Sequence, residues 1–168
     1  MSLKFINTNK ILWLMVVVAI PLMSIFGRGM QGYMFENFSK KNIVITVGAI
    51  LALMCIYAIY GLVKNHAYSR MWHLLWFIPL FIVLPYNFPI IEERFHFIIF
   101  GLFGYLNARL FSIRIAFAVC VSASVLDEAL QWYLPDRVGD WHDVGINLLA
   151  SVAGAVFSYI SMKKNNAY

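Results

Sequence analysis

The sequence predicts an all-α transmembrane helical bundle of about six spans, and three observations lead to this fold class. Apolar residues make up 62% of the 168 residues and charged residues only 12%, against roughly 45–50% and 25% in soluble chains. Apolar runs of nearly bilayer-crossing length recur along the chain. The charges between these runs segregate by sign. A soluble domain of this size needs far more polar surface, so soluble, disordered and fibrous folds are excluded. We expect residues 1–168 to form a single integral membrane domain.

The first two predicted spans are uninterrupted by charge. Ile11–Phe26 follows Lys4 and Lys10, as the apolar region of a signal peptide would. No small-residue cleavage site comes after it, so we interpret it as the first span. Ile43–Val63 is the second and the cleanest.

The other predicted spans are Met71–Ile91, Phe95–Phe111, Ile115–Leu134 and Val144–Met162. The third carries three helix-breaking prolines, Pro79, Pro85 and Pro89. We therefore expect its helix to kink or unwind toward its far end. The last two connections are short, so spans four to six are predicted to pack as antiparallel neighbours.

The charged residues predict the orientation. With six spans, one side holds both termini and only basic residues: Lys4, Lys10, Lys64, Arg70, Arg109, Arg114, Lys163 and Lys164. All the acidic residues fall on the other side or close to it. The positive-inside rule then places both termini in the cytoplasm. Lys and Arg nowhere form a run longer than two, so the formal net charge of +5 does not indicate a nucleic-acid partner.

Polar residues are predicted to gather at the outer end of the bundle: His96, Glu128, Gln131, Arg137, Asp140, Asp143 and Asn147. Glu128 and Gln131 are three apart and share one helix face, as do Asp143 and Asn147, four apart. Asp127 lies about 100° around the helix from Glu128. We therefore expect Asp127 on a different face, toward Gln131 from the other side or toward lipid headgroups. Polar groups inside membrane spans are costly, so each needs a partner or a function.

These residues carry a resemblance to a known family. Residues 126–154 read LDEALQWYLPDRVGDWHDVGINLLASVAG and resemble the signature of the VanZ-like membrane proteins. That signature has a Glu and a Gln three apart, Pro-x-Arg, then an Asp and an Asn at fixed spacing. The matching residues are Glu128, Gln131, Pro135, Arg137, Asp143 and Asn147, and Asp140 fits a frequent acidic position.

The resemblance covers about residues 70–162 and has two departures. Ala150 replaces the first of two small-residue glycines, although Gly154 matches the second. His96 fits the family's histidine, but Glu93 stands where a lysine often precedes that histidine by three residues.

The resemblance implies a site facing the outer leaflet of the bacterial cytoplasmic membrane, where lipid-linked envelope precursors lie. The family's namesake is associated with resistance to the glycopeptide teicoplanin, and the family name implies no reaction. We expect Arg137 to hold a negative headgroup, and Glu128, Gln131, Asp143 and Asn147 to hydrogen-bond it, with His96 and Asp140 beside them.

Two alternatives stay open. The protein could be an enzyme acting on such a headgroup, with Glu128 or His96 as general base and Arg137 stabilising developing charge. Alternatively, it could be a structural or assembly protein whose polar residues only join helices. The sequence predicts no cofactor, because zinc-ligand motifs, glycine-rich phosphate loops and dinucleotide fingerprints are absent from it. A metal on His96, Glu128, Asp140 and Asp143 is the less favoured interpretation.

Overall fold

The computed structural model describes residues 8–88, 91–135, 137 and 139–162, and it is all-α in this part of the chain. The long helices are α1 (Thr8–Asn37), α2 (Lys40–Lys64), α5 (Ile91–Leu110), α6 (Ile113–Tyr133) and α7 (Trp141–Met162). A segment of short elements lies between α2 and α5: η1 (Tyr68–His73), α3 (Leu74–Ile78), η2 (Pro79–Val83) and α4 (Leu84–Tyr86). The predicted all-α class is therefore confirmed.

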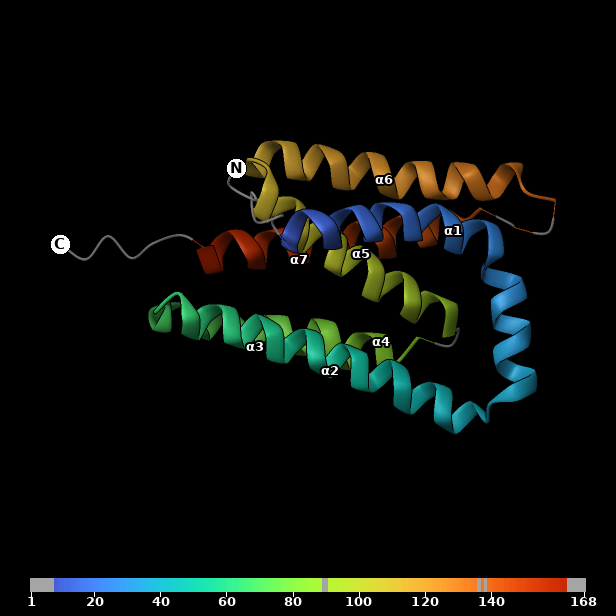
Figure 1. The fold of residues 1–168 in the computed structure, drawn as a ribbon, viewed down its shortest axis with the longest axis horizontal. Helices are drawn as coiled ribbons and strands as arrows, with labels where there is room; N and C mark the ends of the chain where they lie inside the picture. Colours follow the sequence, from blue (N-terminus) through green and yellow to red (C-terminus); the bar gives the residue numbers. More distant parts are fainter. Residues whose placement is uncertain (1–7, 89–90, 136, 138, 163–168) are drawn as a thin grey trace, which may run out of the picture.

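The first helix is longer than the sequence predicts. It continues past Phe26 to Asn37 and has 30 residues. The apolar run ends at Phe26, but backbone hydrogen bonding does not depend on side-chain polarity, so the helix goes on. In Figure 1 the later part of α1 bends away from the bundle axis and crosses toward the start of α2.

The proline-containing segment is irregular, as predicted. It starts as the 3₁₀ helix η1, becomes α-helical, and passes through the π-helical turn η2, which begins at Pro79. A proline removes one backbone donor and crowds the preceding turn, which is a common origin of such widened turns. The irregularity therefore begins at the start of the segment, with η1, and is not confined to its far end.

In the part of the chain that the structure describes, three helices are long and apolar enough to cross a membrane: α1, α2 and α7. Helices α5 and α6 have 20 and 21 residues, but both contain acidic and basic residues that make them less apolar. The bundle surface is apolar, with Leu14 and Val18 of α1 and Leu53 and Ile56 of α2 all more than half exposed. Such a surface suits lipid and not water, so this is a helical membrane protein with several candidate spans.

Helix α5 lies at the centre of the bundle and packs most extensively against α7, with α1 and α6 also in contact. Glycines permit the close approach of α5 and α7. A Cβ added to Gly104 would overlap the backbone oxygen of Ser151, and one added to Gly154 would overlap the backbone oxygen of Gly101. Small residues allow this kind of backbone contact between membrane helices. The small-residue match at Gly154 therefore has a packing role.

The connections place several helix ends together. The start of α1 and the end of α7 lie at one end of the bundle, whereas α6 ends, and α5 and α7 begin, at the opposite end (Figure 1). We call this opposite end the site end. It carries the buried polar residues of the candidate site.

Candidate functional site

A buried polar cluster occupies the interior of the bundle near the site end. Its members come from α1, α5, α6 and α7, and each is no more than 8% exposed: Ser24, His96, Asp127, Glu128, Gln131 and Asn147. We call these six residues the polar cluster. Arg137, in the connection between α6 and α7, borders the polar cluster and is partly exposed.

Gln131 joins the polar cluster to Arg137. Its Nε2 donates to Glu128 Oε1 at 3.0 Å and to Asp127 Oδ2 at 3.3 Å. Its Oε1 accepts two hydrogen bonds from Arg137, from Nη2 at 2.7 Å and Nε at 3.1 Å. A charged donor strengthens these bonds. Gln131 therefore fixes the position of the Arg137 guanidinium group while it satisfies two carboxylates.

Asp127 belongs to the polar cluster: it is buried and approaches Gln131, so the first of its two expected directions is confirmed and the one toward lipid headgroups is wrong. Its Oδ1 accepts a hydrogen bond from Ser24 Oγ, and its Oδ2 accepts one from Asn147 Nδ2 at 3.3 Å. Asp127 and Glu128 point about 100° apart around α6. This offset would exclude Asp127 from the site only if a single narrow face of α6 were buried. Helix α1 also packs on α6, so the buried arc is wider than one face. The expected approach to Gln131 is present.

His96 is held through its Nδ1 atom. Nδ1 lies 3.2 Å from Asn147 Oδ1 and 3.7 Å from Asp127 Oδ2. Because Asn147 Nδ2 donates to Asp127 and Glu128, its Oδ1 is the acceptor, so His96 Nδ1 carries the proton. The basic nitrogen of the neutral imidazole is then Nε2.

Asp140 takes part through its backbone. Its N–H donates to Glu128 Oε2 at 3.2 Å, while its Oδ1 accepts from the backbone N–H of His142 at 3.0 Å. The side chain thus caps the start of α7, as a capping aspartate does. Asp143 is in the first turn of α7, where its charge is favoured by the helix dipole. It lies 3.7 Å from His142 Nδ1 and outside the polar cluster.

The structure therefore brings together five of the seven residues expected at the site: His96, Glu128, Gln131, Arg137 and Asn147. It adds Ser24 and Asp127 to this set, and it also buries Glu93 near the start of α5, outside the polar cluster. Ser24 had a detectable signal, because it is a polar residue inside a long apolar run. Glu93 also had a detectable signal, because it is an acidic residue at a position where the family often has a lysine.

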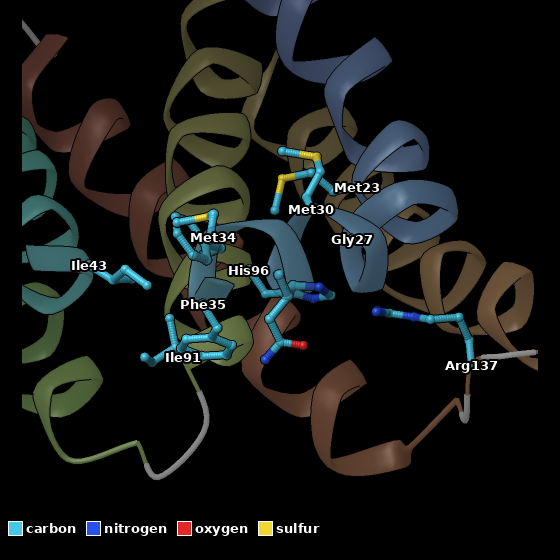
Figure 2. A pocket seen from close by; sticks show the side chains of 11 residues that line it. Met23, Gly27, Met30, Met34, Phe35, Ile43, Ile91, His96 and Arg137 are labelled. Atoms are coloured by element: carbon cyan, nitrogen blue, oxygen red, sulfur yellow. The ribbon is translucent and has the colours of Figure 1, made fainter. Parts of the chain in front are cut away.

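A pocket adjoins the polar cluster. Its volume is about 130 Å³, and its walls come mainly from the later part of α1 and the start of α5: Met23, Gly27, Met30, Gln31, Met34, Phe35, Ile91 and Phe95, with Ile43 of α2. His96 and Arg137 complete the lining. In Figure 2 their side chains extend toward one another from different elements, while the methionines and Phe35 line the other walls. The pocket is thus apolar along most of its wall and basic at one end.

The polar cluster could also hold a cation in principle. His96, Asp127 and Glu128 offer ligand atoms within 4.8 Å of one another. However, their carboxylate oxygens already accept hydrogen bonds from Ser24, Gln131, Asn147 and the Asp140 backbone. A metal would have to displace these donors.

Comparison with known proteins gave one family. The model of the VanZ/LLP1 family matches residues 10–162. The match includes α1 and α2 as well as the segment 70–162 that carries the signature. No curated protein and no solved structure matched the chain significantly.

Proposed function

The chain belongs to the VanZ/LLP1 family of membrane proteins, and we propose that it binds the polar headgroup of a membrane amphiphile at the site end of the bundle. The ligand class is a lipid or a lipid-linked envelope precursor. Binding of such a precursor would also connect the protein to glycopeptide resistance, because teicoplanin acts on precursors at the outer leaflet.

The proposed setting is the bacterial cytoplasmic membrane, crossed about six times, with both termini in the cytoplasm. Two observations support this topology. Among the described residues, the end where α1 starts and α7 finishes carries only basic charges, from Lys10, Lys64, Arg70, Arg109 and Arg114, whereas the site end carries charges of both signs. The irregular segment η1 to α4 runs between the two ends of the bundle, as a broken span would (Figure 1). The site end then faces outward.

One observation carries the ligand proposal: the pocket changes from apolar to basic along its length. Its wall is formed by methionine, phenylalanine and isoleucine side chains, and His96 and Arg137 lie at one end. An amphiphile has this same division, with a headgroup joined to an apolar chain. Methionine-rich walls also adapt to irregular apolar ligands.

Arg137 is the residue we propose to contact an anionic headgroup. Its guanidinium is oriented by two bonds to Gln131, so little freedom is lost on binding. The planar guanidinium presents several N–H donors in a fork that matches the oxygens of a phosphate or carboxylate. The position of the guanidinium group is fixed by the hydrogen-bond network of Gln131, Glu128 and Asn147. Asp140 and Asp143 lie at the edge of the proposed site.

An enzymatic role is the second candidate, and His96 is the observation that favours it. The ring lines the pocket and is oriented from behind by Asn147 and Asp127, as a general base is oriented by a supporting group. In that case a His96→Gln variant would still bind the ligand but would no longer convert it. Glu128 is fully buried and bonded to Gln131 and Asp140, which suits positioning better than proton transfer.

The test is native mass spectrometry of the purified protein, wild type beside Arg137→Ala. We expect the wild type to carry a defined adduct that Arg137→Ala lacks, although both remain helical and melt cooperatively. Arg28→Ala is the matched control, because Arg28 is an exposed arginine outside the pocket, and it should retain the adduct. If wild type carries no adduct and Arg137→Ala melts much lower, the polar cluster is structural and the proposal fails.

A further inference from the structure

A second group of ligating side chains lies at the site end, beside the polar cluster. It consists of Glu93, near the start of α5, and His142 and Asp143, in the first turn of α7. Each offers one nitrogen or carboxylate oxygen, and these atoms lie within 4.8 Å of one another. His142 Nδ1 is 4.0 Å from Glu93 Oε1 and 3.7 Å from Asp143 Oδ1.

Glu93 is the unusual member of this group. It is only 8% exposed, and its Oε2 atom is buried without a hydrogen-bond partner. A carboxylate oxygen that is buried and unbonded is costly. Arg94, the adjacent cation, directs Nη2 to the backbone oxygens of Tyr86 and Phe88 at 3.1 and 2.8 Å.

The carboxylates of the second group accept fewer hydrogen bonds than those of the polar cluster, so the second group has more to gain from a bound cation. Both groups contain one histidine and two carboxylates. In the polar cluster the carboxylates accept hydrogen bonds from a hydroxyl, two amides and a backbone N–H. In the second group Glu93 Oε2 has no such donor, and a second carboxylate, Asp143, lies close to it. A bound cation would give Glu93 Oε2 a partner and would reduce the repulsion between the Glu93 and Asp143 carboxylates.

We propose that Glu93, His142 and Asp143 bind a divalent metal ion of the zinc class. One imidazole and two carboxylates are ligands that zinc accepts. Ligands at about 2.0–2.2 Å in a tetrahedral zinc site lie about 3.4 Å apart. The observed separations of 3.7 and 4.0 Å exceed this by a few tenths of an ångström. His142 has a side chain that is 66% exposed, so it can move inward over that distance.

The ion would join α5 to α7 at their first turns. It would also keep coordination positions open to solvent, because His142 is exposed and Asp143 is partly exposed. A zinc site with three protein ligands and an open position accepts water or an anionic oxygen. This site stands independently of the amphiphile proposal, because metal binding is measurable without any lipid ligand.

The test is zinc titration of the full-length protein in detergent after treatment with a chelator, followed by calorimetry and by melting. We expect one zinc per chain and a rise in melting temperature on zinc addition. Glu93→Gln and His142→Ala should each weaken binding at least about tenfold and lose the zinc-dependent rise. Glu36→Gln, at an exposed glutamate of α1, is the matched control and should bind as wild type does.

Two results would overturn the proposal. One is the absence of saturable zinc binding to the folded wild type. The other is zinc binding that Glu93→Gln and His142→Ala retain but His96→Gln abolishes, which would assign the metal to the polar cluster. Since Glu93→Gln preserves side-chain size, a variant that folds normally in chelator but does not respond to zinc separates metal binding from a general loss of structure.

Discussion

At the scale of single residues, Gln131 is the junction of the site. One amide side chain serves two carboxylates through its nitrogen and one guanidinium through its oxygen. The spacing of Glu128 and Gln131 was visible in the sequence, since residues three apart share a helix face. The participation of Ser24 was not, because it depends on where α1 packs, and neither spacing nor composition specifies that contact. For Asp127 the spacing left two directions open, and the packing of α1 on α6 favours the one toward Gln131.

Replacing Gln131 by leucine tests this junction. The change leaves the buried Asp127 and Glu128 each short of one hydrogen bond and Arg137 short of two, so we expect a loss of about 1–3 kcal/mol in the free energy of unfolding. Asn42→Leu is the control, since Asn42 is exposed at the start of α2. Thermal or chemical unfolding in detergent measures both. If the two variants are equally stable, the network contributes nothing to the fold.

At the scale of elements, the α5–α7 contact determines where the polar residues meet. His96 is on α5 and Asn147 on α7, and the close backbone contact at Gly104 and Gly154 brings the two helices within hydrogen-bonding reach of each other. The existence of these helices could be predicted from the length of the apolar runs in the sequence. The length of α1 was not, because a helix can continue beyond its apolar run, and this extension supplies five of the eleven residues that line the pocket.

Gly104→Ala tests the helix contact. The added Cβ would overlap the Ser151 backbone oxygen, which forces α5 and α7 apart and should destabilise the protein by about 1–3 kcal/mol. Gly48→Ala on α2 is the matched control, because its Cβ would meet nothing within 4 Å. There the change should be neutral or stabilising by up to about 1 kcal/mol. Equal melting temperatures for the two variants would refute the close contact.

At the scale of the whole molecule, the proposed orientation depends on the charges and on the connections between the helices. The family match covers residues 10–162, and the polar residues gather at the end opposite to the start of α1. Apolar composition alone predicted a membrane protein. It did not settle the number of spans, because α5 and α6 each contain both acidic and basic residues, and in the described part of the chain the helices long and apolar enough to cross a membrane are α1, α2 and α7.

A cysteine introduced by Asp140→Cys tests the orientation. Residue 140 is exposed at the site end, so in intact cells it should react with a membrane-impermeant thiol reagent. The native cysteines contribute little background, because Cys55 and Cys120 are 4% and 0% exposed. Arg114→Cys, exposed at the start of α6, should react only after lysis. The reverse pattern would place the site end in the cytoplasm.

The central claim is that the pocket between α1 and α5 holds an amphiphile whose headgroup contacts Arg137. Photo-crosslinking in native membranes tests it most directly, with a photoreactive side chain placed at Met34, which lines the pocket. The control position is Tyr33, its neighbour on α1, which is 63% exposed and lies outside the pocket lining. We predict one defined lipid adduct at position 34 that Arg137→Ala removes, and mixed bulk lipid at position 33 that Arg137→Ala does not change. The same lipid mixture at both positions, unaffected by Arg137→Ala, would contradict the claim.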